Sequence, residues 1–187
     1  MLSLNVTQRA LILGSLLGDG AMRCKVNALL EINHCAAQRS YVDWKYGLLA
    51  DLVSTPPKLR NGNAGRRAYR FTTRSLPELT PFYKAFYRRG VKAVPPLWLS
   101  PLSLATWFMD DGSKSRNAVY LNTQQFDCES QALLIEMLRA QFGIAASLNR
   151  DKQYLRIRIA VGSMERFGAL VGPHILPEMR YKLPNRP

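Results

Sequence analysis

The stretch LILGSLLGDG (residues 11–20) is apolar almost throughout and ends with an aspartate between two glycines. A second stretch, LATWFMDDGS (104–113), is also apolar and also reaches Asp-Gly at its end. Apolar residues on nearly all sides of a helix predict burial against more than one neighbour. Both stretches therefore predict buried helices, and each helix places a carboxylate, Asp19 or Asp111, at its C-terminal end.

The chain around these two helices follows the same order twice, which predicts an α+β protein built from two similar halves. We place the halves at 1–97 and 98–187, because the prolines of VPPLWLSP (94–101) mark a break. After its apolar helix, each half offers a strand, at 26–33 and at 117–124. An amphipathic helix, an arginine-rich strand pair and a further helix are expected to follow.

Capping residues mark the ends of several expected helices. Thr7 offers a hydroxyl cap for the first apolar helix. Ser100 caps the second, and Pro101 takes the first helical position, where proline is favoured. The amphipathic helix of the second half is expected to start after Asp127 and to close at Gly143.

The net charge points to a polyanionic partner. Lys and Arg number 26 against 13 Asp and Glu, so the formal net charge is +13, and arginine supplies 18 of the 26. The first half carries 15 basic and 5 acidic residues, whereas the second carries 11 and 8. An excess of this size favours nucleic acid over an anionic membrane, and the first half should dominate the attraction to phosphate.

Several classes of protein are disfavoured. Three cysteines without a CxxC pair make a disulfide framework or a zinc site improbable. Two histidines are too few for a histidine-rich metal site. No apolar run reaches the roughly 18 residues that span a bilayer, and no signal peptide is recognised. We expect no membrane association and an intracellular reducing compartment: organelle, cytoplasm or nucleus.

Two arginine-rich segments show the alternation of half-buried strands. In YLRIRIAV (154–161) one face carries Leu155, Ile157, Ile159 and Val161, and the other carries Tyr154, Arg156 and Arg158. In RRAYRFTTR (66–74) Tyr69 and Phe71 oppose Arg66, Arg70, Thr72 and Arg74. The Asn-Gly of the preceding RNGNAG predicts a hairpin turn. Sheets with one apolar and one basic face can lie in the major groove of DNA.

A carboxylate at the C-terminal end of a helix faces the negative end of the helix dipole, which favours a nearby cation. Mg²⁺ would accept both the carboxylate and backbone carbonyl oxygens. Lys92 lies 73 residues after Asp19, and Lys182 lies 71 residues after Asp111; a proline follows each lysine closely. Paired carboxylates holding divalent ions, flanked by lysines, indicate a phosphodiester hydrolysis site.

At these residues the chain resembles the LAGLIDADG homing endonucleases, particularly the single-chain, two-motif, intron-encoded type. ILGSLLGDG and LATWFMDDG stand where that family has its two signature helices, and PHILPEMRYKL near the C-terminus is also similar. The resemblance implies two pseudo-symmetric αββαββα halves, a central interface between the two helices, and antiparallel sheets along the major groove. It further implies a monomer that cuts both strands of a long, pseudo-palindromic or asymmetric DNA target across the minor groove, leaving short 3′ overhangs.

The same resemblance assigns roles to residues. The acids Asp19 and Asp111 are expected to hold two or three shared Mg²⁺ ions, with backbone carbonyls from Gly18 and Asp110. Lys92 and Lys182 fall near the family's basic position in the active site, so they join the two acids as catalytic candidates. The sequence DDG leaves either Asp110 or Asp111 as the ligand; we favour Asp111, because it directly precedes glycine as Asp19 does.

Further candidates surround these residues. Those expected to contact DNA are Arg23, Lys25, Arg66, Arg70, Thr72, Arg74, Lys114, Arg116, Tyr154, Arg156 and Arg158. Those expected to position the attacking water, at the ends of the first strands, are Asn33, His34 and Gln124.

Two other functions stay open. The first is an RNA-binding maturase that assists intron splicing, because maturases of this family can retain the same motifs. The second is a DNA-binding regulator that has lost catalysis. The acids and lysines of both motifs argue against the regulator, which would be free to lose them.

Overall fold

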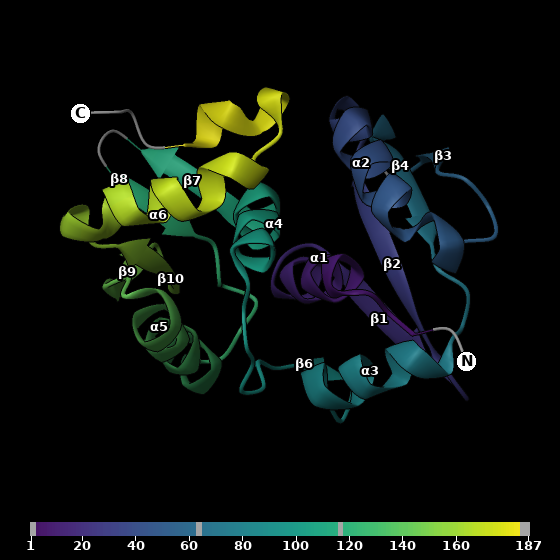
Figure 1. Ribbon diagram of the computed structural model, residues 1–187, viewed down its shortest axis with the longest axis horizontal. Coiled ribbons are helices and arrows are strands. Elements are labelled where there is room, and N and C mark those ends of the chain that lie inside the picture. Colours follow the sequence, from purple (N-terminus) through teal and green to yellow (C-terminus); the bar gives the residue numbers. More distant parts are fainter. Residues whose placement is uncertain (1–2, 63–64, 116–117, 184–187) are drawn as a thin grey trace. The chain divides into compact units, whose positions relative to one another are not determined.

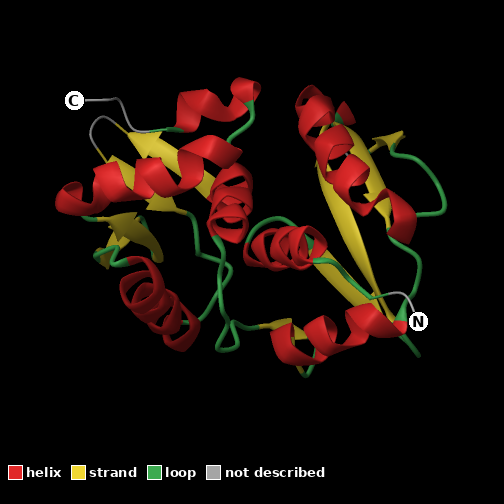
Figure 2. Cartoon of the chain, viewed as in Figure 1, coloured by secondary structure: helices red, strands yellow, loops and turns green. Residues whose placement is uncertain are grey.

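The computed structural model describes residues 3–62, 65–115 and 118–183 (Figure 1). The chain divides into two compact units, Met1–Lys84 and Ala85–Pro187. Each unit combines strands and helices (Figure 2). Each holds a four-stranded antiparallel sheet, with strand order β1-β2-β4-β3 in the first and β7-β8-β10-β9 in the second. The shared strand order confirms the predicted α+β class. In the described parts of the chain, no helix is both long and apolar enough to cross a membrane.

The first unit begins with the apolar helix and its sheet. Its elements are α1 (Val6–Leu17), β1 (Ala21–Cys24), β2 (Ala28–Cys35), η1 (Ala36–Gln38), α2 (Arg39–Leu49), η2 (Ala50–Leu52), β3 (Lys58–Asn61), β4 (Arg67–Thr72) and η4 (Pro77–Leu79). Helix α3 (Thr80–Phe86) runs across the division between the units. The two inner strands pair in antiparallel register, with Ile32 of β2 opposite Phe71 of β4.

The second unit repeats this order with its own apolar helix. Its elements are β5 (Tyr87–Arg88), β6 (Val91–Lys92), α4 (Pro101–Asp111), β7 (Gly112–Ser115), β8 (Ala118–Leu121), α5 (Cys128–Phe142), β9 (Ala146–Asp151), β10 (Tyr154–Ile159), η5 (Val161–Ser163), α6 (Met164–Val171), η6 (Gly172–His174) and η7 (Pro177–Lys182). The inner strands pair with Leu121 of β8 opposite Ile157 of β10.

Helix α1 begins earlier than the sequence suggested. Its cap is Asn5, not Thr7: the Asn5 side-chain oxygen accepts the backbone N–H of Gln8 at 2.8 Å. The Gln8 side chain in turn accepts the backbone N–H of Asn5 at 3.0 Å. This reciprocal capping box satisfies two N–H groups at the helix start, which a threonine two residues later would leave without partners.

The other predicted helix ends are confirmed. The Ser100 hydroxyl accepts the N–H of Ser103 at 3.1 Å, with Pro101 at the first helical position. Asp127 caps α5, and the bond it accepts from the Ser130 N–H holds the pKa of the Asp127 carboxyl below its ordinary value. Gly143 closes α5 in the left-handed conformation.

The strand boundaries needed more correction. The strand expected at 26–33 runs from Ala28 to Cys35, because Val26 lies in the preceding turn and is exposed. The strand expected at 117–124 ends at Leu121. Val161 was expected on the inner face of its strand but lies beyond it in η5, also exposed.

Each sheet buries one face beneath a helix. In the first unit, α2 packs against β2 and β4, whose inner residues Leu30, Ile32, Tyr69 and Phe71 are buried. In the second unit, α5 packs against β9 and β10. Helix α4 packs against α6, and the Phe108 ring meets Phe167 edge-on with ring centroids 5.0 Å apart.

The glycines after the two aspartates lie against the last turn of the preceding helix. A Cβ on Gly20 would lie 2.7 Å from the carbonyl oxygen of Ser15, and a Cβ on Gly112 would overlap Phe108. The φ of Gly112 is −75°, which any residue can adopt. Space, rather than backbone freedom, therefore requires glycine at both positions.

Alanine at either glycine is expected to destabilise its unit. Gly20→Ala and Gly112→Ala should each lower the free energy of unfolding by about 1–3 kcal/mol, because the new methyl group forces the helix end to shift. Urea denaturation measures this change. Gly47→Ala is the matched control: nothing lies within 4 Å of the added Cβ, and alanine should stabilise α2 by up to about 1 kcal/mol. Wild-type stability of Gly112→Ala would contradict the steric explanation.

Candidate active site and nucleic-acid interface

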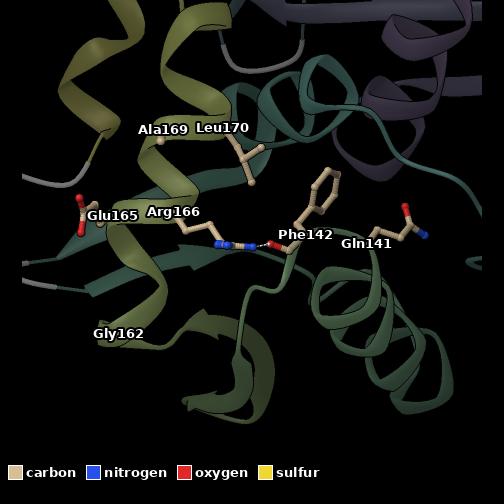
Figure 3. Close-up of a pocket in the computed structure, with 7 residues that line it drawn as sticks. All are labelled: Gln141, Phe142, Gly162, Glu165, Arg166, Ala169 and Leu170. Carbon is tan, nitrogen blue, oxygen red and sulfur yellow. Dashed lines mark hydrogen bonds between the residues drawn. The ribbon is translucent and has the colours of Figure 1, made fainter.

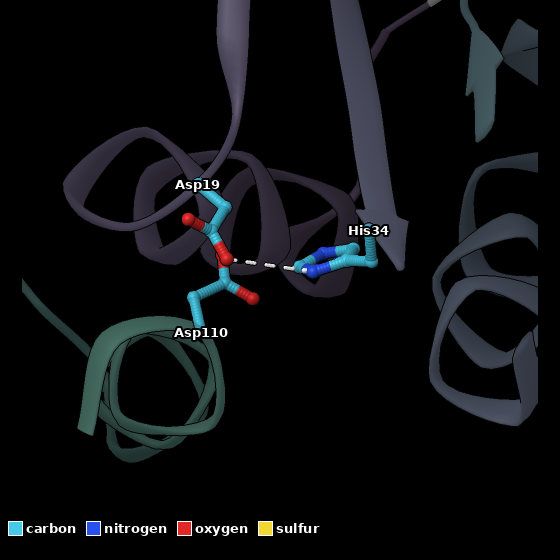
Figure 4. Close-up of side chains that lie close together, drawn as sticks. All are labelled: Asp19, His34 and Asp110. Carbon is cyan, nitrogen blue, oxygen red and sulfur yellow. Dashed lines mark ion pairs between the residues drawn. The ribbon is translucent and has the colours of Figure 1, made fainter. Parts of the chain in front are cut away.

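Asp19 lies just beyond α1, with its carboxylate beside a histidine. Gly18 caps the helix through its N–H, which bonds the carbonyl oxygens of Gly14 and Ser15 at 3.1 Å each. The Asp19 Oδ2 atom lies 3.4 Å from Nδ1 of His34 (Figure 4). The Asp19 side chain is 46% exposed, whereas that of His34 is 2% exposed. The carboxylate is thus held on one side and accessible on the other.

A buried lysine contacts the same histidine. Lys45 of α2 has no exposed surface, and its Nζ lies 3.4 Å from Nε2 of His34. The ammonium also lies 4.6 Å from the ring centroid of Tyr41, a favourable distance for a cation–π contact. Sequence reasoning missed Lys45. A signal existed, because Tyr41, Lys45 and Leu49 share the buried stripe of α2 at four-residue spacing.

The neighbouring strand carries a tyrosine that is hydrogen-bonded to α2. Tyr69 of β4 pairs with His34 in the sheet register, and its hydroxyl donates to Asp43 of α2 at 2.9 Å. Burial raises the pKa of the Tyr69 phenol, and the bond to Asp43 raises this pKa further. The phenol therefore stays protonated near neutral pH and fastens α2 to the sheet.

The two aspartates at the end of α4 have different surroundings. Asp110 is buried, and Asp111 is partly exposed. The Asp111 carboxylate accepts a hydrogen bond from Nε2 of Gln125 at 3.2 Å, and its backbone carbonyl accepts the N–H of Asn122 at 3.0 Å. Figure 4 also draws Asp110, which belongs to the second unit.

Lys182 is brought to this helix end. Its side chain is buried, and its Nζ lies 2.5 Å from the carbonyl oxygen of Met109 and 3.2 Å from that of Asp110. The ammonium thus compensates the negative end of the α4 dipole next to both aspartates. Sequence spacing paired Lys182 with Asp111, and the contact here is with the backbone one and two residues earlier.

Lys92 has a different environment. It lies on β6 opposite Tyr87, within the second unit, whereas Asp19 belongs to the first. The Lys92 Nζ lies 5.8 Å from the ring centroid of Phe126. The two lysines that sequence spacing made equivalent are therefore held differently.

The outer face of the first sheet is basic. We call it the first basic face: Arg23, Glu31, Asn33, Lys58, Arg60, Arg70 and Thr72. Within it, Glu31 lies 3.1 Å from Arg23 and 3.8 Å from Arg70. Lys58 and Arg60 were not anticipated, because β3 is short and exposed along its whole length.

Three other predicted DNA contacts of the first unit lie off this face. The Arg74 guanidinium donates to the backbone oxygen of Asp51 at 2.7 Å, so its side chain is committed to η2. Arg66 precedes β4 and is exposed, and Lys25 is exposed in the turn between β1 and β2. The expectation that Arg74 shares a strand face with Arg70 is wrong, because β4 ends at Thr72.

The second sheet presents Tyr154, Arg156 and Arg158 on its outer face, as predicted. The Arg156 guanidinium lies 4.0 Å from the ring centroid of Tyr120 and 3.5 Å from the Asp151 carboxylate. Lys114 pairs with buried Val119 and therefore lies on the opposite face of β7. Arg116 is outside the described residues.

The three candidates for positioning water do not share one setting. Asn33 is exposed on the first basic face, and His34 points inward beside Lys45. Gln124 is half-buried in the turn after β8, three residues past the strand end. Among them, His34 is the residue that contacts Asp19.

An open pocket of about 690 Å³ lies in the second unit between α5 and α6 (Figure 3). Arg166 crosses it, and its Nη1 donates to the carbonyl oxygen of Phe142 at 2.9 Å. None of the predicted site residues lines this pocket. The candidate chemistry therefore lies at the helix ends and not in this hollow.

The sequence and fold match known proteins. The chain is 28% identical to a probable intron-encoded endonuclease 1 of Wickerhamomyces canadensis, over 97% of this chain and 85% of that protein. It is 26% identical to the cytochrome b mRNA maturase bI2 of Saccharomyces cerevisiae, over 97% of this chain and 48% of that protein. It is also 31% identical to a RecA protein of Mycobacterium gastri, over 94% of this chain and 46% of that protein. The chain thus spans about half the length of the last two.

Solved structures agree. The homing endonuclease I-WcaI, bound to its DNA recognition sequence, matches with a TM-score of 0.90 at 26% identity, covering 100% of this chain and 90% of that one. The homing endonuclease I-DmoI, in complex with DNA and Ca, shares the fold at 12% identity and a TM-score of 0.61, covering 94% and 96%. The sequence profile of the LAGLIDADG DNA endonuclease family matches residues 9–167. The chain therefore belongs to the LAGLIDADG DNA endonuclease family.

Proposed function

We propose that this chain is a site-specific homing endonuclease that hydrolyses both strands of double-stranded DNA in the presence of Mg²⁺. The observation that supports this proposal most is that an aspartate lies at the C-terminal end of each apolar helix. Asp19 lies there in the first unit and Asp111 in the second. The proposed cut runs across the minor groove and leaves short 3′ overhangs. It requires the ends of α1 and α4 to come together over one DNA target.

The residues present fit a hard divalent cation. Carboxylate and backbone carbonyl oxygens are the ligands that Mg²⁺ prefers. Asp19 keeps an accessible carboxylate, and Gly18 beside it supplies a carbonyl; Asp111 and Asp110 would do the same in the second unit. Two or three ions shared between these groups would supply Lewis acidity and an activated water. Asp111 is favoured over Asp110 as the carboxylate ligand, because Gly20 and Gly112 follow the two acids in matching steric roles.

The other residues of the site are proposed to bind the DNA and to stabilise the ends of the two apolar helices. Lys182 holds the last carbonyls of α4 and lowers the negative potential around Asp110 and Asp111. Lys92 is proposed to approach the phosphate from β6 of the second unit. The two outer sheet faces would lie in the major groove of a long, pseudo-palindromic or asymmetric target, where arginine reads guanine and phosphate. The acting form is proposed to be a monomer.

Binding to DNA is expected to weaken steeply with salt. If the basic faces neutralise about six phosphates or more, log affinity should fall against log salt with a slope of about −5 or steeper. Arg70→Gln should make the slope shallower by about one unit, measured by fluorescence anisotropy with Ca²⁺ in place of Mg²⁺.

Arg139→Gln is the control, because Arg139 pairs with Glu136 on the exposed side of α5. It should leave the slope within experimental error. A flat salt response of the wild-type protein would contradict the assignment of the sheets as the DNA interface.

The activity and its target can be found in one experiment. The protein is incubated with a randomised DNA library, or with DNA from the host locus, plus Mg²⁺, and the cut ends are sequenced. A unique long site with short 3′ overhangs is the expected result. Intact DNA across the whole library would argue against the endonuclease.

A maturase is the second candidate, favoured by the similarity to cytochrome b mRNA maturases over nearly the whole chain. In that case the basic surface would bind a folded intron RNA in a reducing compartment such as an organelle. Splicing of the host intron with and without the protein separates this function from DNA cleavage. Binding to DNA without either activity would instead support a regulator.

A further inference from the structure

Lys45 is a fully buried cation in the first unit, and burial of a charge is costly unless specific contacts compensate for it. Its ammonium contacts the Tyr41 ring and Nε2 of His34. His34 in turn reaches Asp19 through its other ring nitrogen. Lys45, His34 and Asp19 therefore form a continuous polar chain from the interior to the half-exposed carboxylate.

The chemistry of the donors favours one place for the proton in this chain. A protonated Lys45 has three N–H donors and no acceptor, so a neutral His34 facing it would accept at Nε2. A neutral imidazole that accepts at one nitrogen carries its proton on the other. Nδ1 of His34 would then carry the proton and face Oδ2 of Asp19, which lies 3.4 Å away.

We infer that Lys45 is a positioning residue for Asp19, acting through the tautomer of His34. The Nδ1–H donor holds Oδ2 and so fixes the direction in which the carboxylate faces a metal ion. Without Lys45, His34 could carry its proton on Nε2 and present a lone pair to the Asp19 carboxylate, which would repel it. This inference rests on the proposed function insofar as it concerns cleavage, but the proton placement stands independently of it.

The second unit lacks this arrangement at the equivalent position. The equivalence follows from the strand register. Ala21, which follows the first Asp-Gly, pairs with Glu31, and Ser113, which follows the second, pairs with Tyr120. Three residues further along, His34 of the first unit corresponds to Thr123 of the second. The side-chain amide of Gln131 donates from Nε2 to the hydroxyl oxygen of Thr123 at 3.2 Å and to its backbone carbonyl oxygen at 2.8 Å. A neutral amide there replaces the ammonium, so the effect of Lys45 should concern Asp19 and not Asp111.

The tautomer can be measured directly on the ¹⁵N-labelled full chain without metal. The chain has two histidines, so His174→Gln leaves His34 as the one imidazole in the spectrum. Two-bond ¹⁵N–¹H correlations should show the Nδ1–H tautomer in this background, and Lys45→Met should shift the population toward Nε2–H. An Nε2–H tautomer with Lys45 present, or no change on its removal, would overturn the inference.

A double-mutant cycle tests the consequence for catalysis. Lys45→Met should lower the single-turnover cleavage rate about tenfold, as loss of a group that orients a metal ligand does. Affinity for DNA in Ca²⁺ should stay close to that of the wild type, because Lys45 is fully buried and is not part of the first basic face. In a His34→Ala background, which removes the ring that links Lys45 to Asp19, Lys45→Met should have no further effect on the rate.

Two results are decisive, and one further variant serves as a control. Equal losses from Lys45→Met in both backgrounds would mean that Lys45 does not act through His34 and would refute the coupling. Lys84→Met, on the exposed side of α3, controls for loss of a positive charge. If the wild-type protein cuts no DNA, the proposed function fails, and the tautomer measurement alone then decides the role of Lys45.

Discussion

Replacing Asp19 by asparagine is expected to abolish double-strand cleavage while leaving DNA affinity nearly unchanged. Asparagine keeps the size of the side chain but removes the negative charge that binds a divalent ion. It also leaves the basic sheet faces intact. The single-turnover rate should fall by about 10²- to 10³-fold or more, as when one preorganised electrostatic group is removed from an active site. Asp111→Asn is expected to have the same effect.

The charge change has a matched control on the protein surface. Glu136→Gln removes one carboxylate from the exposed side of α5, where Glu136 pairs with Arg139, and should cut DNA at the wild-type rate. Asp110→Asn should lose less activity than Asp111→Asn, because its proposed contribution is a backbone carbonyl. Full cleavage by both Asp19→Asn and Asp111→Asn would refute the assignment of the site.

The order of elements could be predicted because local signals agreed with each other. Ser100 with Pro101, and Asp127 with Gly143, bracket helices α4 and α5 as expected. The alternation in β10 also holds, since Ile157 and Ile159 are buried while their neighbours face outward. Such patterns reflect side-chain periods of the backbone itself, which need no tertiary information.

Errors arose where two local signals competed. Thr7 and Asn5 can both cap a helix, and the choice depends on Gln8, which closes a capping box with Asn5. Val26 has a high strand propensity, but it lies in the tight turn between the end of β1 and the start of β2. Arg74 fits the alternation of its segment, yet the strand ends before it and a backbone carbonyl captures its side chain.

Tertiary contacts within the candidate site were the least predictable. His34 was expected near the attacking water, and the structure adds its partner Lys45, eleven residues later on a different element. A lysine on the buried stripe of a helix is a local inconsistency, and such inconsistencies concentrate at functional sites. The contact of Lys182 with the end of α4 likewise joins segments more than seventy residues apart.

Lys182→Met is expected to reduce cleavage by about 10²-fold and also to destabilise the second unit. Methionine matches the length of lysine but donates no hydrogen bond, so the carbonyls of Met109 and Asp110 lose their shared donor. The electrostatic potential beside Asp111 at the end of α4 would then become more negative. A more negative potential disfavours an approaching phosphate. Urea denaturation should show a loss of about 1–3 kcal/mol, the cost of leaving buried acceptors unpaired.

Lys92→Met is expected to separate the loss of cleavage rate from the loss of folding stability. The Lys92 side chain is partly exposed and rests over Phe126, so its loss should cost less than about 1 kcal/mol in unfolding free energy. A reduced cleavage rate with unchanged stability would then report its charge near the phosphate. Single-turnover rates at saturating protein, compared with the unfolding data, assign each loss to chemistry or to folding. Wild-type rates in both variants would show that neither lysine stabilises charge during hydrolysis, and the proposed site would then consist of the two acids alone.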